Sequence, residues 1–409
     1  MSWSSRATVA DVSRGLEAAR SAGWWPRRSL MFHDLEALEA RLAALIDAFP
    51  SDAVHGIAIK ANPLVELLRV IVEAGGGLEA ASWEEVQCAL AAGCPPERLV
   101  FDSPAKTDEE LAEALRLGLW LNADHEGELA RLADLGAPSA ARIGLRVNPA
   151  IGAGSIGHTS TVSRDSKFGE LIERAPELVK RYPFVTGLHV HTGSQGVGLA
   201  LLEAAARATG EVVEALELDW IDVGGGLPVR YTDDDPEPPT VHAWADALAK
   251  LPFWGRRRIV TELGRALHAG TGWAVSRIEA VKVIDGTPLY VVHLGADLLL
   301  RPVYRADAWR HEFYVLRPDG SPREGSHKAH VGGPLCFAGD IIARDRDLPP
   351  AEPGDLLVIR DTGAYTLSMW SRHCSRGLPA VVGLRDQTAV PLFAGETPAD
   401  VVQSWSLRS

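Results

Sequence analysis

The hydrophobic pattern of the chain changes its period once, near residue 275. Before that point, short apolar runs rich in β-branched and small residues alternate with segments of helical spacing. The predicted strands are Val54–Ala61, Gly77–Ala81, Arg98–Ser103, Leu119–Ala123, Ala141–Val147, Thr186–Thr192, Leu218–Val223 and Arg258–Glu262. The predicted helices between them include Ser82–Ala92, Asp108–Leu117, His125–Leu135, Ile172–Arg181 and Leu199–Leu216. Eight strand–helix units in roughly 220 residues predict a (β/α)8 barrel, with a doubly wound open sheet as the competing fold.

The remaining segments predict a second domain. After residue 275 the helical spacing disappears, and Gly and Pro turns separate short apolar runs. The strands predicted there are Val275–Ile284, Pro288–Leu294, His311–Val315, Ala329–Val331, Asp355–Asp361 and Ala380–Leu384. A strand over Leu30–His33 and a helix from Asp34 through Phe49 precede the barrel strands, and the polar residues 1–29 are expected to contribute an edge segment. We therefore expect a barrel domain over residues 30–272 and an all-β domain built from residues 1–29 plus 273–409.

Composition and charge narrow the range of partners. With 409 residues and 46% hydrophobic positions, the chain can bury two sizeable cores. A net charge of -13 argues against nucleic acid and anionic membranes as partners, although the basic stretch from Arg301 to Lys328 could meet a small anion. The sequence contains no run of about eighteen apolar residues and no signal-peptide core. Its four scattered cysteines predict neither a disulfide framework nor a metal site, so we expect a cytoplasmic protein.

Chemically apt side chains recur at the carboxyl ends of the predicted strands, where barrel enzymes gather their functional groups. Lys60 is the only full charge in the apolar run HGIAIKAN, and is either a snorkelling strand end or a reactive amine. The other strand-end groups are Glu79, Ser82, Arg146, Asn148, His189, His191, Ser194, Gly224, Gly225, Gly226, Glu262, Gly264 and Arg265. The cofactor that fits these groups is pyridoxal phosphate. It would meet an amine, a carboxylate, a flat imidazole and bare glycine amides at the carboxyl mouth of the predicted barrel.

The same chemistry suggests roles for three of these residues. Glu262 is suited to keep the ring nitrogen of the cofactor protonated, which makes the ring an electron sink. His191 could stack on the ring face. His189, two residues earlier on the same face of the strand, is interpreted as a core histidine.

The chain resembles the fold-type III pyridoxal-phosphate-dependent decarboxylases, the family of diaminopimelate, ornithine and arginine decarboxylases. The matching motifs are AIKAN, LEAASWEE, FDSPAKTDEEL, LRVNP, SKFG, HVHTGSQ, DVGGGLP, ELGR, LLRPVY, GPLCFAGD and DTGAYTLSMWS, in the family's order over nearly the whole chain. Diaminopimelate decarboxylase is the nearer pattern. The resemblance implies a (β/α)8 TIM barrel with a C-terminal, Greek-key-type β-barrel domain, as in alanine racemase and ornithine decarboxylase.

The resemblance also implies site residues. Lys60 would be the Schiff-base lysine, His191 the ring-stacking histidine and Glu262 the partner of the pyridine nitrogen. The phosphate would be held by Ser194, Gly224, Gly225, Gly226, Gly264, Arg265 and Tyr365. These residues all match the family's motifs as they stand in this sequence.

Four further residues concern the substrate and the reaction. Arg301 would bind a substrate carboxylate, and Arg146 and Phe337 are also expected to contact the substrate. Cys336 would be a proton donor that reaches into the partner subunit's site, because the family builds its sites across a two-fold homodimer interface.

Phe337 departs from the family pattern, which has an acidic residue after the cysteine to bind the distal amine of a diamino acid. A phenylalanine cannot pair a buried ammonium, which would cost roughly several kcal/mol if left unpaired. We therefore predict α-decarboxylation of an amino acid or conjugate with a neutral or anionic distal group, such as a citryl-diaminopropionate-like siderophore intermediate. The alternative is diaminopimelate decarboxylase of lysine biosynthesis. A racemase and a catalytically silent cofactor-binding homologue are further alternatives, which the retained GPLC motif and the retained site residues disfavour.

Overall fold

The computed structural model describes residues 6–25, 28–138, 142–156 and 161–407, which fall into two compact units. The first unit comprises Glu39–Val229 and Glu237–Leu267. The second comprises residues 6–38, Arg230–Pro236 and residues 268–407 of the described chain. Within the described ranges, we find no helix with the length and apolar character that spanning a bilayer requires. The predicted domain boundaries at residues 30 and 272 stay a prediction.

The first unit is a closed parallel barrel, which confirms the predicted fold. Its strands are β2 (Val54–Ala58), β3 (Gly77–Ala80), β4 (Leu99–Asp102), β5 (Trp120–Ala123), β6 (Ile143–Asn148), β8 (Val185–His189), β9 (Trp220–Asp222) and β10 (Arg258–Thr261). They pair in the order β5-β4-β3-β2-β10-β9-β8-β6, and β5 also pairs with β6. That last pairing closes the sheet and excludes the open doubly wound alternative. The strands are buried on both faces, as parallel strands covered by helices must be.

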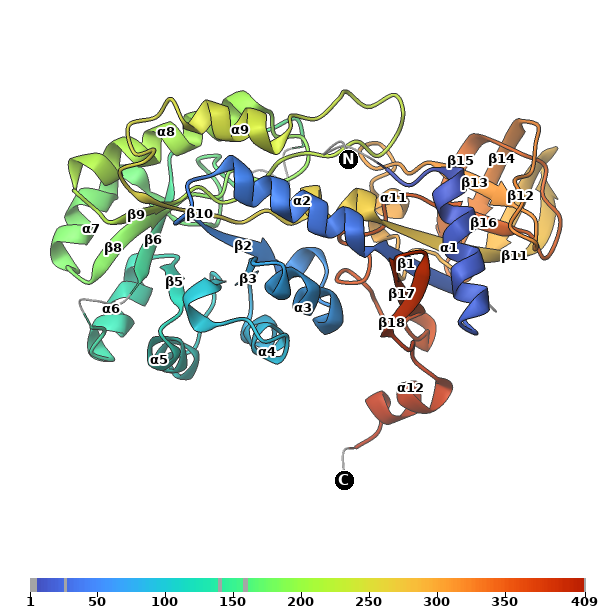
Figure 1. Ribbon diagram of the computed structural model, residues 1–409, viewed down its shortest axis with the longest axis horizontal. Helices are drawn as coiled ribbons and strands as arrows, with labels where there is room; N and C mark the ends of the chain where they lie inside the picture. The colour runs from blue at the N-terminus through green and yellow to red at the C-terminus, as the bar shows by residue number, and fades with distance from the viewer. Residues whose placement is uncertain (1–5, 26–27, 139–141, 157–160, 408–409) are drawn as a thin grey trace. The chain divides into compact units, whose positions relative to one another are not determined.

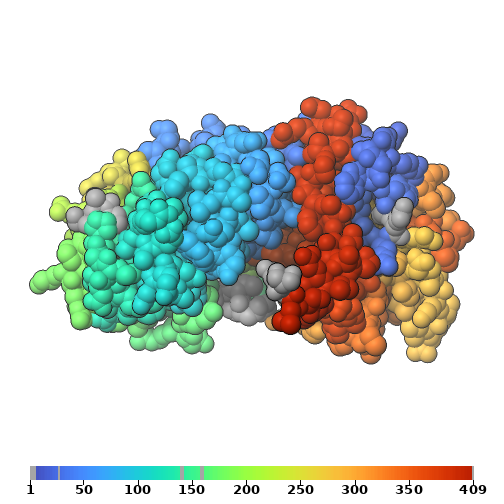
Figure 2. Space-filling model, turned by 90° about the horizontal axis from the view of Figure 1, so that it is seen from below, coloured from blue at the N-terminus to red at the C-terminus, as the bar shows by residue number. Residues whose placement is uncertain are grey.

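Helices cover the outside of the barrel, and each of them after α2 follows a barrel strand (Figure 1). They are α2 (Leu35–Ala48), α3 (Val65–Glu73), α4 (Trp83–Ala91), α5 (Asp108–Leu117), α6 (Glu126–Asp134), α7 (Ala175–Arg181), α8 (Leu199–Ala215) and α9 (Val241–Leu248). Helix α5 shows why such segments begin and end where they do. Thr107 and Glu110 form a reciprocal capping box at its start, and Gly118 ends it with φ of 72°. In the space-filling view, cyan and teal residues make up much of the face of the barrel unit that is turned toward the viewer (Figure 2).

Three predicted site residues lie just beyond the strands rather than inside them. Strand β2 ends at Ala58, and Lys60 lies in the 3-10 turn Ile59–Ala61. Strand β8 ends at His189, so His191 belongs to the following loop, and Glu262 follows β10 directly. Here the backbone bonds across to neighbouring loops, for example from the amide of Glu262 to the carbonyl of Gly224 (2.7 Å). These side chains therefore leave the regular ladder at the carboxyl mouth of the barrel.

The second unit is mostly sheet. Its strands are β1 (Ser29–Asp34), β11 (Gly272–Ile284), β12 (Thr287–Val292), β13 (Phe313–Leu316), β14 (His327–Gly332), β15 (Ile341–Leu348), β16 (Leu356–Ile359), β17 (Ala380–Arg385) and β18 (Thr388–Phe393). The main path runs β15-β14-β12-β11-β1-β17-β18, and β16 joins β11 to β13. Two short helices, α11 (Leu300–Tyr304) and α12 (Pro398–Trp405), interrupt the predicted all-β pattern.

The predicted edge segment over residues 1–29 is wrong for its central part, which forms helix α1 (Val9–Ser21). A capping box between Thr8 and Asp11 starts this helix. Its apolar face packs into the core that contains Phe32 and Trp273, whose rings stack with centroids 5.4 Å apart. Burial of one helical face decided the structure here, because the segment's polar residues lie on the opposite face. Residues 1–5 and 26–27 of the predicted segment lie outside the described residues.

Candidate active site

A lysine amine and a buried carboxyl group form the first part of the site. The Nζ atom of Lys60 is ion-paired with Glu79 of β3, and 33% of the Lys60 side chain is exposed while Glu79 is fully buried. Burial raises the pKa of the Glu79 carboxyl to about 8; Lys60 opposes this shift, and the nearby carboxylate of Glu262 adds to it. The amine is thus reachable from solvent and is held by a group that can exchange a proton near neutral pH.

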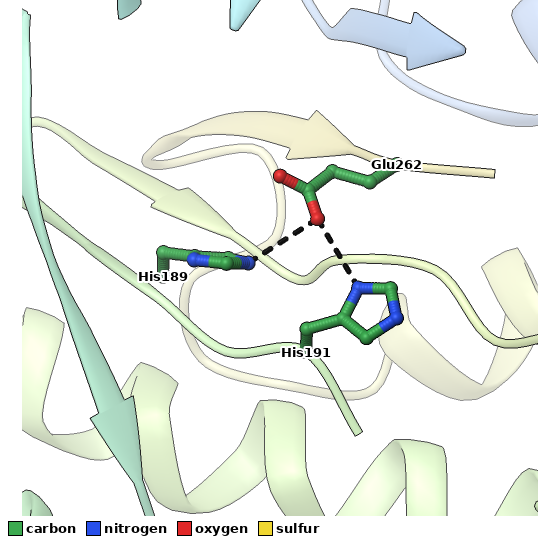
Figure 3. Close-up of side chains that lie close together, drawn as sticks. All are labelled: His189, His191 and Glu262. Carbon is green, nitrogen blue, oxygen red and sulfur yellow. Dashed lines mark hydrogen bonds and ion pairs between the residues drawn. The ribbon is translucent and has the colours of Figure 1, made fainter. Parts of the chain in front are cut away.

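Glu262 is the second part, and two histidines contact one of its oxygens (Figure 3). His191 Nδ1 lies 3.1 Å and His189 Nε2 lies 3.3 Å from Glu262 Oε2. Burial opposes ionisation of Glu262, but the two imidazoles hold its pKa well below the ordinary range, with His189 the larger influence. The other oxygen, Oε1, is buried and has no hydrogen-bond partner among the described residues. The site therefore offers an ionised carboxylate with one oxygen available to a ligand.

The two histidines differ in charge. Burial disfavours the charged form of His189, but Glu262 and Asp102 outweigh it and raise the pKa of His189 to about 9. Burial lowers the pKa of His191, which leaves that imidazole neutral at neutral pH. His189 is therefore a charged member of the site and not only the core histidine that the sequence suggested.

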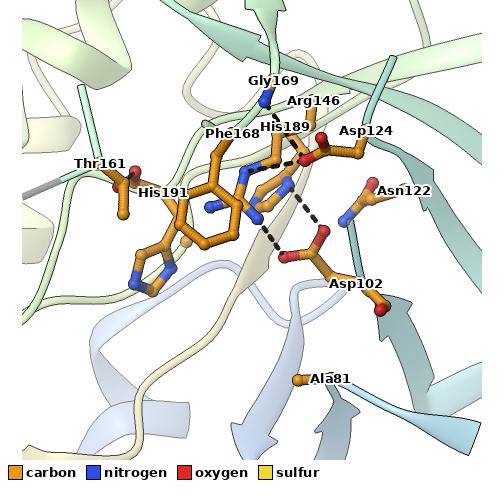
Figure 4. A network of polar contacts seen from close by, with 12 residues as sticks. Ala81, Asp102, Asn122, Asp124, Arg146, Thr161, Phe168, Gly169, His189 and His191 are labelled. Carbon is orange, nitrogen blue, oxygen red and sulfur yellow. Dashed lines mark hydrogen bonds and ion pairs between the residues drawn. The ribbon is translucent and has the colours of Figure 1, made fainter. Parts of the chain in front are cut away.

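Arg146 belongs to the same buried network (Figure 4). Its Nη1 atom donates to Asp102 Oδ2 at 2.9 Å, and its guanidinium lies 4.3 Å from the ring centroid of Phe168. Burial raises the pKa of Asp102, but Arg146 and then His189 reverse this effect and lower it. Arg146 is 6% exposed. Its predicted contact with a substrate stays a prediction, since the described contacts engage it with carboxylates of the barrel.

The glycine loop after β9 is shaped for close approach. Gly224 and Gly226 have φ of 65° and 117°, which residues with a Cβ rarely adopt. A Cβ at Gly225 would lie 2.2 Å from the carbonyl oxygen of Glu262. The amide of Gly224 donates to Asp222 Oδ1 at 2.8 Å, which ties the loop to the end of β9. The amide of Gly225 donates to His191 Nδ1 at 3.4 Å, so the loop is also tied to the predicted ring-stacking histidine, and its glycine turn is of the kind that binds phosphate.

The other predicted phosphate ligands of the barrel lie beside each other after β8 and β10. The Ser194 hydroxyl accepts hydrogen bonds from Arg265 Nε at 3.1 Å and from Nη2 at 2.9 Å. Gly264 leaves no room for a side chain, since an added Cβ would lie 2.9 Å from that of Ala61. The Ser194 hydroxyl and the Arg265 guanidinium are further hydrogen-bond donors beside the glycine loop, and the guanidinium also carries a positive charge.

The remaining predicted residues lie in the second unit. Arg301 Nη2 donates to the carbonyls of Ala364 (3.0 Å) and Tyr365 (3.2 Å), and Tyr365 has a φ of 56°. Cys336 is exposed, and its amide donates to Cys374 Sγ at 3.5 Å. The structure therefore brings Arg301 and Tyr365 together.

Phe337 contacts an aromatic residue of the same unit. Its ring stacks on that of Tyr304, with centroids 5.8 Å apart and an interplanar angle of 17°. The position that is acidic in the family pattern is therefore part of an apolar pair.

Sequence reasoning missed two acidic residues, Asp102 and Asp222. Both are the last residues of buried strands, β4 and β9, and both are almost fully inaccessible. Burial, followed by the charge of Glu262, raises the pKa of Asp222 well above its ordinary range. A carboxylate that ends an apolar strand, as in LVFD and WID, was the available signal.

The donor set fits pyridoxal phosphate on structural grounds. The orphaned Oε1 of Glu262 can accept a hydrogen bond from a protonated ring nitrogen, and Gly224–Gly226 form a glycine turn of the kind that binds phosphate. His189, His191 and Glu262 also place ligand atoms within 4.8 Å of one another, a spacing that metal sites share. The predicted absence of a metal stays a prediction.

A parallel barrel with an accessible lysine, an ionised carboxylate and a phosphate-type glycine loop at its strand ends defines a cofactor-dependent TIM-barrel enzyme. The family described as "Pyridoxal-dependent decarboxylase, pyridoxal binding domain" matches residues 35–269. The chain belongs to this family of pyridoxal-phosphate-dependent carboxy-lyases, as the sequence predicted.

The relatives agree with this assignment. The diaminopimelate decarboxylase of Zymomonas mobilis is 34% identical over 352 residues, which cover 83% of this chain and 82% of the relative. That of Deinococcus radiodurans is 35% identical over 381 residues, which cover 91% and 94%. The crystal structure of the Helicobacter pylori diaminopimelate decarboxylase complexed with L-lysine superposes with a TM-score of 0.85 at 27% identity, covering 93% of this chain and 97% of that one.

Proposed function

We propose that the chain removes one carboxyl group of meso-diaminopimelate as carbon dioxide. The observation that carries this proposal is the identity of 34% and 35% to two diaminopimelate decarboxylases, over 83% and 91% of this chain. A substrate with a neutral or anionic distal group, expected from the sequence, has no comparable support among these relatives.

In this proposal, three barrel residues handle the cofactor's reactive end. Lys60 would hold pyridoxal phosphate covalently through its amine. Glu262 would accept a hydrogen bond from the ring nitrogen at Oε1, and His191 would stack on the ring. When bound there, the cofactor supplies an electron sink for the bond that breaks. Glu79 contacts the Lys60 amine and can exchange a proton with it near neutral pH, because the pKa of Glu79 is raised to about 8.

The phosphate end has its own group of ligands. The residues assigned to it are Ser194, Gly224, Gly225, Gly226, Gly264, Arg265 and Tyr365. The support is chemical: backbone amides of a glycine turn, a hydroxyl and a guanidinium can all donate to an anion, and the Ser194–Arg265 contact holds two of these groups in position.

Two residues of the second unit are assigned roles toward the substrate. Arg301 binds a carboxylate of the substrate and so helps to orient the bond that breaks. Cys336 protonates the carbon that has lost carbon dioxide, and its thiol is exposed as this role requires. We propose that Cys336 acts in the site of the partner subunit of a homodimer.

A second candidate is a substrate whose distal group is neutral or anionic, such as a citryl-diaminopropionate-like conjugate. Phe337 favours it, because its ring packs on Tyr304 and cannot pair an ammonium. An unpaired buried ammonium would weaken binding by roughly several kcal/mol.

Carbon dioxide release from the cofactor-loaded protein separates the two candidates. The panel contains meso-diaminopimelate, lysine, ornithine and a citryl-diaminopropionate conjugate, each with the parent and with Phe337→Glu. Turnover of diaminopimelate by the parent, with none on the conjugate, supports the first candidate. If the parent turns over only the conjugate and Phe337→Glu gains activity on diaminopimelate, the diaminopimelate proposal is refuted. The same result supports a substrate with a neutral or anionic distal group. No release from any substrate refutes both.

A further inference from the structure

Four charged side chains of the barrel interior form a chain of alternating sign that ends at Glu262. Arg146 Nη1 lies 2.9 Å from Asp102 Oδ2, and His189 Nδ1 lies 3.8 Å from Asp102 Oδ1. On its other side, His189 Nε2 lies 3.3 Å from Glu262 Oε2. The exposed fractions of Arg146, Asp102, His189 and Glu262 are 6%, 5%, 0% and 2%. Figures 3 and 4 show consecutive links of this series, which we call the charge chain.

Stability alone gives a poor account of the charge chain. Desolvation of buried ion pairs often costs more than their attraction returns, and well-packed apolar residues of similar volume are then at least as stable. The four residues come from β6, β4, β8 and the end of β10, so the closed barrel has to bring them together. The chain ends at the carboxylate whose Oε1 lacks a partner among the described residues. This arrangement points to a function at that oxygen.

We propose that His189 is a positioning residue that keeps the proton of the Glu262–cofactor hydrogen bond on the ring nitrogen. The inference rests on the proposed role of Glu262 as the partner of that nitrogen. The His189 cation touches the carboxylate itself, whereas a group bonded to Oε1 has the carboxylate between it and His189. Because Coulomb energy falls with distance, His189 lowers the proton affinity of Glu262 more than that of the group beyond it. The proton therefore stays on the ring.

The titratable groups around His189 determine whether its imidazole is protonated. Asp102 stabilises the imidazolium, and Arg146 in turn keeps Asp102 ionised. Asp222 also faces His189, and burial followed by Glu262 raises the pKa of Asp222 well above the ordinary range, which disfavours its charged form. His191 is neutral because burial lowers its pKa. Arg146 thus acts through Asp102 and His189 on Glu262, which gives it a role other than the predicted substrate contact.

The test is the NMR chemical shift of the cofactor's ring nitrogen in the loaded protein, measured with isotope-labelled pyridoxal phosphate. At neutral pH the parent should show a protonated ring. His189→Gln keeps a hydrogen-bond donor but removes the charge, and should move the shift toward that of a neutral pyridine. Its kcat should fall by about tenfold or more while KM changes by less than about twofold, since the effect concerns the reacting ring and not substrate binding. Asp102→Asn should move the shift in the same direction by less.

His55→Gln is the matched control. His55 is also buried in the barrel, its Nδ1 lies 2.9 Å from Thr261 Oγ1, and burial lowers its pKa to about 4. It is therefore neutral and lies outside the charge chain, so its replacement should leave the ring-nitrogen shift unchanged.

A ring-nitrogen shift that is the same in the parent, His189→Gln and Asp102→Asn would overturn the proposal, even if both variants lost activity. Should the variants not fold, the parent alone decides: its ring signal should move toward neutral pyridine as the pH rises through about 9, where His189 loses its proton. A ring that stays protonated through that range would contradict the proposal. If no amino acid is decarboxylated but the ring signal depends on His189, the proposed reaction is refuted and the role of His189 stands.

Discussion

Gly225→Ala tests whether the glycine loop after β9 is the phosphate cradle. The added Cβ would lie 2.2 Å from the carbonyl oxygen of Glu262 and 2.8 Å from its carbonyl carbon. Neither atom belongs to a flexible side chain. Because the amide of Glu262 also donates to the carbonyl of Gly224 at 2.7 Å, the two loops are held to each other and cannot separate freely.

The size of the effect follows from this contact. Ordinary Cβ contacts begin near 3.4 Å, so the loops must separate by about 1 Å or more. Overpacking of this kind costs about 1–3 kcal/mol. If the strain is relieved by withdrawing the amides of Gly224 to Gly226 from the phosphate, the Kd for pyridoxal phosphate should rise by about tenfold to hundredfold.

The assay is a titration of the apoprotein with pyridoxal phosphate, followed by absorbance, together with a thermal unfolding curve for each variant. Gly198→Ala is the control, because an added Cβ there meets nothing within 4 Å and its φ of -86° suits alanine. It should leave the Kd unchanged. A folded Gly225→Ala protein whose Kd stays within about twofold of the parent would refute the assignment of this loop to the phosphate.

Three further predictions concern stability and the reaction. Lys106→Met should lower the unfolding free energy of the barrel by about 3–5 kcal/mol, measured by hydrogen exchange, because it leaves Glu128 buried without its partner at 2.6 Å. Adding Glu128→Leu should restore most of the loss, and equal exchange in the single variant and the parent would contradict the argument. Because the pKa of His189 is raised from 6.5 to about 9, its stabilising contribution is complete below pH 6.5 and disappears as the pH rises through about 9. Hydrogen exchange should show this decline in the parent and not in His189→Gln, and parallel pH profiles would exclude it. Cys336→Ala should lower kcat by about a hundredfold with the cofactor Kd unchanged, and an unchanged kcat would exclude Cys336 as the proton donor.

The sequence by itself determined the barrel, the cofactor and the class of reaction. The alternation of short buried strands with amphipathic helices follows from burial, which depends on local spacing. The segments around Lys60, the Gly224–Gly226 loop and Glu262 can also be recognised locally. Their residue types predict an amine, a phosphate site and a carboxylate at the strand ends. The confirmed fold and family required no knowledge of which side chains touch.

The exact ends of the elements could not be predicted as well. Lys60 and Glu262 lie just past strands that were expected to include them, because the backbone there bonds to neighbouring loops rather than along the ladder. Helix α1 was missed for a related reason. Its apolar stripe is buried only when residues from distant parts of the sequence, such as Trp273 and Val382, pack against it.

Only the tertiary structure decided how the charges of the site are paired. In the sequence, His189 is a histidine inside an apolar strand and Arg146 a cation at a strand end. The closed barrel sets the ends of β4, β6, β8 and β10 around one interior, where Asp102 lies between Arg146 and His189. Whether a buried group is charged depends on such neighbours, and they are distant in the sequence. Local pattern therefore specified the parts of the site, and barrel closure specified their ionisation.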